Sequence, residues 1–251
     1  MTRPLRMLEK LGRRAGGGLL DIVLPPHCVA CGVLLPGAHP PLCTTCRQAL
    51  LEIAAGTCQQ CGQPAGGLPC PVCGFHPRPL CWIAPVWVYG GPLADLIIDF
   101  KRRGTPLLAE FFARQLARRA RENLADGNNV DLLVPVPLHP ARLARRGFNQ
   151  SLLLARRVAR LLGRPLAANL LRRHRDTPVQ ADLAGRRARR ENVRGAFRVS
   201  RPRRVAGRRL CLVDDVVTTG ATLEACARTL LDAGATSVAA LALARRQWQN
   251  P

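Results

Sequence analysis

Two adjacent carboxylates stand just before a short loop rich in hydroxyl groups near the end of this 251-residue chain. The acids are Asp214 and Asp215, and the loop consists of Thr218, Thr219, Gly220, Ala221 and Thr222. Backbone N–H groups, hydroxyl donors and the positive end of a following helix dipole make such a loop a predicted phosphate site. The paired acids suit sugar hydroxyls or a hydrated Mg²⁺. Together the two features indicate a site for a ribose 5-phosphate that carries a pyrophosphate.

The elements around this segment place it at the edge of a sheet. Four apolar residues, Leu210–Val213, predict a strand buried on both faces that ends where the acids begin. An amphipathic helix is expected over residues 223–233. Because ligands of open α/β sheets lie beyond the carboxyl ends of strands, the loop is well placed to bind one. An ordinary strand, turn and helix is the weaker interpretation, since capping needs only one acid and one Thr.

A second group of anion-binding residues follows another predicted strand. The apolar run 130–137 must end at Pro135 and Pro137, because proline cannot donate a hydrogen bond to a neighbouring strand. The segment that follows is dense in basic side chains, and the planar fork of arginine suits pyrophosphate. Its candidate residues are Leu138, His139, Arg142, Arg145 and Arg146. Asn149, Gln150 and Ser151 come next, as helix-capping or ligand groups.

The N-terminal third of the chain contains four Cys-x-x-Cys motifs. Their cysteines are Cys28, Cys31, Cys43, Cys46, Cys58, Cys61, Cys70 and Cys73. Two such motifs supply the four thiolates of a closed, structural zinc site, so one or two zinc ions are expected. Sequential pairing is the simplest arrangement, and an interleaved pairing fits the spacing as well. A redox dithiol would need a single motif in a thioredoxin-like βαβ context.

Composition describes the class of protein but not its partner. The formal charge is +22, and Lys10 and Lys101 are the only lysines among 38 basic residues. A surface this basic attracts polyanions such as nucleic acid, although a codon bias towards arginine gives the same composition with no specific partner. Aromatic residues make up 4% of the chain, so stacking platforms for single strands are scarce. The chain lacks an apolar run long enough for a transmembrane helix and a signal-peptide hydrophobic block, which predicts a cytoplasmic protein.

The remaining pattern predicts three regions. Residues 1–24 form an N-terminal helix or leader segment, residues 25–82 the cysteine module, and residues 83–251 one α/β domain. Within that domain we expect further strands at 83–89 and 238–244, and helices at 93–103, 106–124 and 152–162. The polar, basic stretch 172–197 is expected to be a mobile loop or lid between strands.

These residues resemble two related patterns. The stretch 210–222 is similar to the signature of type I phosphoribosyltransferases, which bind phosphoribosyl pyrophosphate (PRPP). By that resemblance Asp214 and Asp215 contact the ribose hydroxyls and residues 218–222 wrap the 5-phosphate. With the four cysteine motifs, the whole chain resembles the ComF family. The other matching pieces are Tyr89, Phe100-Lys101-x-x-Gly104, residues 135–138, residues 146–150, Gln180, Arg190-x-Asn192 and Ala244-Arg245.

The resemblance implies a parallel sheet flanked by helices, preceded by a double zinc ribbon. It also implies Mg²⁺-assisted PRPP binding and phosphoribosyl transfer to an unknown acceptor, linked to DNA uptake in natural competence. Catalysis would rest on positioning and charge stabilisation, without a covalent nucleophile. The alternative is a non-catalytic accessory protein that uses the same fold to bind a nucleotide, single-stranded DNA or competence-machinery proteins.

Overall fold

The computed structural model describes residues 26–35, 41–53, 57–63, 70, 73–74, 78–125, 127, 129–176 and 191–247. Contacts between Cα atoms divide the chain into two compact units, 1–49 and 50–251. The first unit contains helix α2 (Thr44–Gln48) and a bridge between His27 and Leu34. The expected N-terminal helix, Gln180 and Arg190 lie outside the described residues. No helix of the described ranges has both the length and the apolar character needed to cross a membrane.

The second unit is built on a four-stranded parallel sheet in the order β1-β6-β5-β2. Its strands are β1 (Ile83–Val88), β2 (Leu132–Pro135), β5 (Arg209–Val217) and β6 (Ser237–Arg245). β5 and β6 are almost entirely buried, which explains their continuous apolar runs. The predicted parallel α/β fold is confirmed.

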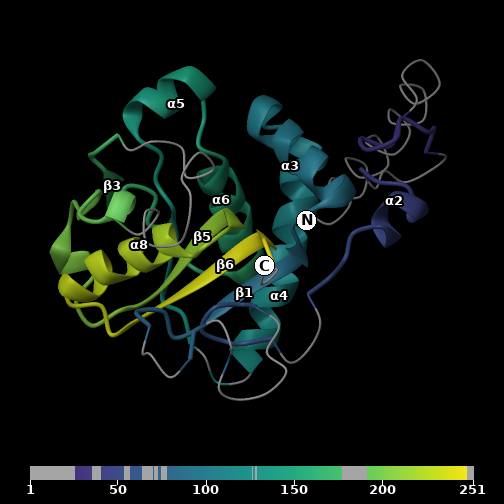
Figure 1. The fold of residues 1–251 in the computed structure, drawn as a ribbon. Helices are drawn as coiled ribbons and strands as arrows, with labels where there is room; N and C mark the ends of the chain where they lie inside the picture. Colours follow the sequence, from purple (N-terminus) through teal and green to yellow (C-terminus); the bar gives the residue numbers. More distant parts are fainter. Residues whose placement is uncertain are drawn as a thin grey trace, which may run out of the picture. The chain divides into compact units, whose positions relative to one another are not determined.

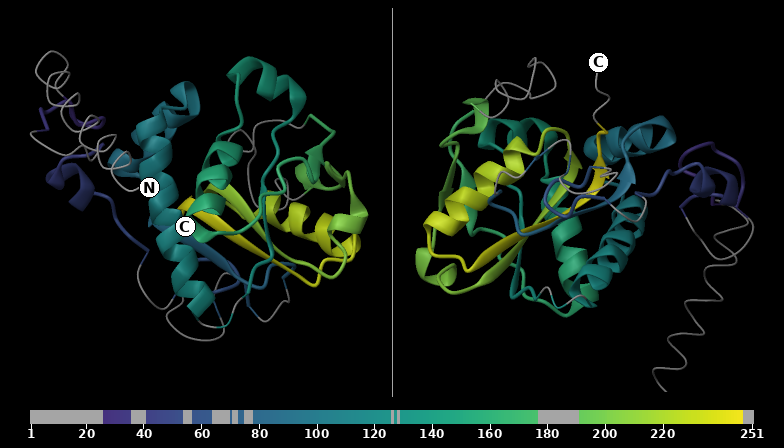
Figure 2. Two further views of the ribbon diagram at one scale, coloured as in Figure 1. Left: turned by 180° about the vertical axis from the view of Figure 1, so that it is seen from behind. Right: turned by 60° about the horizontal axis from the view of Figure 1, so that its bottom comes forward.

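Helices cover both faces of this sheet. α3 (Gly91–Arg103), α4 (Pro106–Ala125) and α6 (Gln150–Leu162) precede β5, whereas α8 (Ala221–Asp232) follows it. α4 and α6 pack on each other and on one face, and α8 packs on β5 and β6 from the opposite face (Figures 1 and 2). Trp87 of β1 stacks on Phe111 of α4 with ring centroids 5.8 Å apart, so aromatic packing joins α4 to the sheet.

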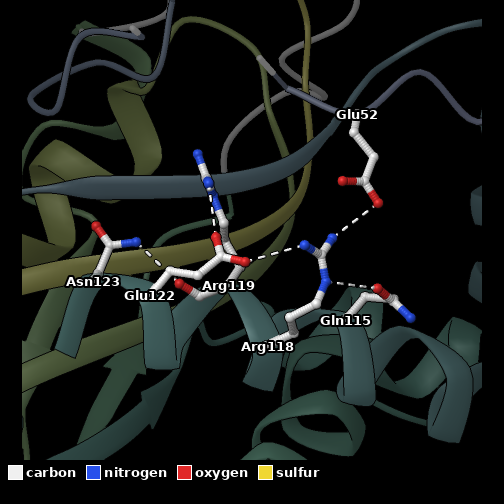
Figure 3. Close-up of polar contacts among 6 residues, drawn as sticks. All are labelled: Glu52, Gln115, Arg118, Arg119, Glu122 and Asn123. Carbon is white, nitrogen blue, oxygen red and sulfur yellow. Dashed lines mark hydrogen bonds and ion pairs between the residues drawn. The ribbon is translucent and has the colours of Figure 1, made fainter. Parts of the chain in front are cut away.

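The segment after the first unit is attached to the outer edge of the sheet. Val88 donates its backbone N–H to Leu51, and Ile53 donates to Val86, which makes a short antiparallel bridge beside β1. Arg118 of α4 forms an ion pair with Glu52 of this segment at 2.9 Å, so the helix surface holds the segment as well (Figure 3). Glu122, on α4 itself, contacts the same arginine at 3.0 Å.

Two expected boundaries are corrected. The signature strand does not end at Val213 but continues through both acids to Val217, because β6 pairs with it as far as Arg245. The basic segment after β2, for which no helix was expected, contains a short helix, α5 (Pro140–Arg146). The ends of the expected lid form an antiparallel pair, β3 (Leu171–Arg173) and β4 (Phe197–Val199), followed by the turn η2 (Pro202–Arg204). Residues 177–190, in the middle of the lid, are not among those described.

Candidate functional site

Asp214 and Asp215 lie near the C-terminal end of β5, and both are buried. Their exposed fractions are 9% and 5%, although two neighbouring ionised carboxylates are costly to remove from water. Such a pair persists only with compensating partners, and each acid has its own set.

Asp215 is held by a cation and an amide from two helices. Lys101, at the end of α3, lies 3.0 Å from its Oδ2, and Gln150 at the start of α6 donates its Nε2–H to the same oxygen at 3.0 Å. Arg146 in turn donates to Oε1 of Gln150 at 2.6 Å. Burial alone would lower the pKa of Lys101, but attraction to Asp215 and Asp214 outweighs it and raises that pKa. Lys101 is therefore a fixed cation beside the acids.

Asp214 has weaker compensation. Its Oδ1 accepts hydrogen bonds from Ser151 Oγ at 3.1 Å and from the backbone N–H of Asp215 at 2.9 Å. Burial, and then repulsion from Asp215, raises the pKa of Asp214 to about 7. This carboxyl group changes charge near neutral pH, as perturbed groups at functional sites often do.

The hydroxyl-rich loop lies between these acids and α8. Gly220 has φ +85°, a left-handed conformation that favours glycine, and α8 begins at the next residue. Thr219 is buried, and its Oγ1 accepts a hydrogen bond from the N–H of Ala221 at 3.3 Å. Thr218 and Thr222 are half-buried. The loop thus presents hydroxyl groups at a helix N-terminus, the chemistry expected of an anion site.

The residues of the basic segment have different surroundings. His139 caps α5, accepting the N–H of Ala141 on Nδ1 at 3.3 Å. Arg142 lies 3.7 Å from Asp176, Arg145 is exposed, and Leu138 is half-buried. Of the five candidate residues of this segment, Arg146 is linked to the acids through hydrogen bonds, because it donates to Gln150, which donates to Asp215.

Several neighbours of the acids had no assigned role in the sequence-based site. Lys101 contacts Asp215, while Arg173 of β3 is 7% exposed and lies over the ring of Phe197 at 5.6 Å. Burial and then repulsion from Arg142 lower the pKa of Arg173. Attraction to Asp214 acts to raise it, so Arg173 and Asp214 interact electrostatically. Lys101 could have been noticed in the sequence, because it is one of two lysines in an arginine-rich chain. Arg173 lies inside a run of basic residues, and nothing in the sequence distinguishes it from its neighbours.

The eight cysteines form two clusters with sequential pairing. Within each cluster, one formed by Cys28 to Cys46 and the other by Cys58 to Cys73, the four Sγ atoms all lie within 4.8 Å of one another. In the first, burial would raise the pKa of Cys28, but backbone N–H groups led by that of Cys43 lower it to about 6. Four thiolates at such spacing suit tetrahedral zinc, and the interleaved pairing is excluded.

Comparison with known proteins identifies the family. Residues 109–249 match the phosphoribosyl transferase domain and residues 19–81 the double zinc ribbon domain. The chain is 36% identical over 228 residues to the DNA utilization protein YhgH of Salmonella typhi, which covers 89% of this chain and 99% of that protein.

The chain belongs to the ComF family.

Two further members of the ComF family carry competence names. Competence protein F of Haemophilus influenzae is 34% identical over 160 residues, covering 62% of this chain and 69% of that protein. Competence protein ComFC of Bacillus subtilis is 27% identical over 254 residues, covering 94% and 100%. The similarity to YhgH and ComFC includes both the cysteine module and the sheet domain.

Proposed function

We propose that this protein binds PRPP together with Mg²⁺ and transfers its phosphoribosyl group to an acceptor in the utilisation of DNA. The observation that carries the proposal is the buried Asp214–Asp215 pair next to a hydroxyl-rich loop at a helix N-terminus. The names of the relatives, a DNA utilization protein and two competence proteins, support the cellular setting. The eight clustered thiols that would hold zinc suit a reducing compartment such as the cytoplasm.

Each part of the site has a role in this proposal. Residues 218–222 bind the 5-phosphate through hydroxyl and backbone donors, and Asp214 and Asp215 bind the ribose hydroxyls. Arg146 is the best placed of the basic residues to meet the pyrophosphate, with Arg142 and Arg145 beside it on α5. Asp214 and Asp215 are the residues that would hold Mg²⁺, which would neutralise the departing pyrophosphate.

Catalysis in this scheme needs no covalent nucleophile. Positive charge develops at the ribose C1 as the pyrophosphate anion leaves. Lys101 and Arg146 are fixed cations that favour the departing anion without reorganising, while the loop donors hold the 5-phosphate in place. Lys101 also places a cation 3.0 Å from Asp215, beside the proposed contact with the sugar.

Calorimetric titration of the zinc-loaded protein with PRPP and Mg²⁺ tests the proposal. Binding to the wild type that disappears in Asp214→Asn/Asp215→Asn supports the site. Asp131→Asn is the control, because Asp131 pairs with Arg209 at the other end of β5. A folded wild type that does not bind PRPP contradicts the transferase function.

A second candidate function, binding of single-stranded DNA, is favoured by the charges around β3 and β4. Arg172 and Arg198 face each other across the two strands and both are exposed, although like charges in direct opposition destabilise a strand pair. Arg203 and Arg204 in η2 are exposed too, and none of these four has an acidic partner within the described ranges. By contrast, Arg114, Arg118 and Arg119 of α4 form ion pairs with Glu110, Glu52 and Glu122.

The salt dependence of DNA affinity tests whether the arginines around β4 and η2, and not those of α4, contact the strand. Each phosphate contact contributes a slope of about −0.7 in log K against log salt for a single strand, so Arg198→Gln/Arg203→Gln/Arg204→Gln should reduce the slope by about 2. The control Arg114→Gln/Arg118→Gln/Arg119→Gln removes the same charge from α4 and should leave the slope nearly unchanged. Equal losses in both variants would mean that only the net charge attracts DNA.

A further inference from the structure

The second cysteine cluster is attached to the sheet next to the hydroxyl-rich loop of residues 218–222, which we call the phosphate loop. Gln63, which follows Cys61 and is 1% exposed, donates its Nε2–H to the carbonyl of Arg246 at 2.8 Å. The backbone carbonyl of Gln63 accepts the N–H of Cys58 at 2.8 Å. The turn of residues 58–63, which carries two of the four thiolates, is therefore hydrogen-bonded to Arg246, the residue after β6. Arg246 in turn donates its backbone N–H to the carbonyl of Val217 at the end of β5.

A second connection enters the first turn of α8. Arg78, five residues after Cys73, forms an ion pair with Glu224 at 2.6 Å, and the two side chains are 8% and 6% exposed. Glu224 donates its backbone N–H to the carbonyl of Gly220. A methyl group placed on Gly220 would lie 3.9 Å from Oε1 of Glu224 and 3.7 Å from Nη1 of the fully buried Arg245. The charged cluster of Arg78, Glu224 and Arg245 thus lies directly behind the loop.

The charges of this cluster bear on anion binding. A buried carboxylate at the helix N-terminus would repel a phosphate in the loop unless a cation neutralised it. Arg78 and Arg245 are the cations next to this carboxylate, and Arg78 comes from the segment that follows the cysteine cluster, whereas Arg245 belongs to β6. Loss of Arg78 would remove the cation that contacts Glu224 at 2.6 Å and leave that buried charge less well compensated, so the order of the loop depends on Arg78.

We propose that Gln63 and Arg78 are positioning residues of the phosphate loop, and that the second cysteine cluster orders this loop when it holds its metal. The cluster is then part of the ligand site and not a separate structural module. The inference deepens the phosphate-binding role proposed above, but order in the loop can be measured without any ligand.

Hydrogen exchange of the zinc-loaded full chain tests the inference. In Arg78→Met, the amides of residues 218–224 should exchange at least about fivefold faster, while the amides of α4 keep their wild-type rates. Arg78→Lys retains the charge and should restore part of the protection. Arg118→Met is the control, because it removes an arginine whose ion pairs are exposed and lie on α4, away from α8.

Metal dependence is tested with one cysteine from each cluster. Cys61→Ser should accelerate exchange in residues 218–224, whereas Cys31→Ser, in the first cluster, should not. If Arg78→Met does not fold, Gln63→Leu, which removes the hydrogen bond to Arg246, takes its place. Wild-type exchange rates in residues 218–224 of folded Arg78→Met, or of folded Gln63→Leu, overturn the inference.

PRPP titration of the same variants separates the inference from the proposed function. If the wild type binds PRPP, Arg78→Met should bind at least about fivefold more weakly, and unchanged affinity would count against the inference. If the wild type does not bind PRPP, the transferase function fails, while the exchange rates still decide whether the cluster orders the loop.

Discussion

Asp214 and Asp215 are neighbours in sequence but differ in chemistry. Lys101 and Gln150 contact Asp215, whereas Asp214 has hydrogen bonds from Ser151 and a backbone N–H and a pKa near 7. The sequence predicted the two acids because their spacing is local. It could not predict which acid receives the cation, since Lys101 and Gln150 come from two other helices that only the fold brings together.

The raised pKa of Asp214 predicts how stability depends on pH. Because the folded-state pKa, about 7, exceeds the ordinary value of 3.8, the folded protein holds an extra proton between these values. Stability of the ligand-free protein should therefore fall as pH rises from 4 to 7, by at most about 1.4 kcal/mol per pH unit. Urea unfolding at a series of pH values measures this.

Asp214→Asn is the informative variant for this prediction. It cannot ionise, so its stability should lose that slope and exceed that of the wild type at pH 8. PRPP binding, which needs the carboxylate, should strengthen in the wild type up to pH 7 and then level off. A wild-type stability profile that matches Asp214→Asn across this range would show that Asp214 has an ordinary pKa.

At the scale of elements, the ends of α3 and α6 must meet for Lys101 and Gln150 to reach the same carboxylate. α3 ends at Gly104 with φ +61°, and a Cβ there would lie 2.9 Å from Cζ of Phe148. The ring of Phe148, two residues before Gln150, therefore packs against a glycine that has no side chain. This contact sets the distance between the two helix ends.

Gly104→Ala should disturb both the fold and the site. The left-handed conformation costs alanine about 1–2 kcal/mol, and the clash with Phe148 adds to that cost and moves Lys101 away from Asp215. Gly163→Ala is a matched control, since Gly163 ends α6 at φ +63° with no atom within 4 Å of its Cβ position. Thermal unfolding and PRPP titration should show a larger loss of stability, and a loss of affinity, for Gly104→Ala alone. Equal effects of the two substitutions would mean that the Phe148 contact is unimportant.

Local sequence patterns predicted most elements but not all of their ends. α3, α4 and α6 lie close to their expected positions because their apolar periodicity is a local signal, as are the glycine caps of α3 and α6. β5 extends past Val213 because pairing with β6 satisfies the backbone of two acidic residues, a tertiary effect that propensity does not contain. α5 was missed because it is one short helix within an Arg-rich segment.

At the scale of the whole molecule, the two cysteine clusters belong to different compact units. Cys28 to Cys46 lie in residues 1–49, and Cys58 to Cys73 lie in residues 50–251 with the sheet. The repeated motifs predicted one or two structural zinc ions, and their pattern gives no sign of this difference. The difference reflects contacts within residues 50–251, such as that of Gln63 with Arg246.

The two clusters should therefore respond differently to loss of metal. We expect two zinc ions per chain, and one in either Cys31→Ser/Cys46→Ser or Cys61→Ser/Cys73→Ser, because a closed site needs all four thiolates. The first variant should unfold at nearly the wild-type temperature in calorimetry of the sheet. The second should unfold several degrees lower, since about 1 kcal/mol corresponds to about 2–4 °C in a domain of this size. Zinc content measured by atomic emission confirms that each variant lost one ion. Equal shifts in the two variants would show that the second cluster is no more integrated with the sheet than the first.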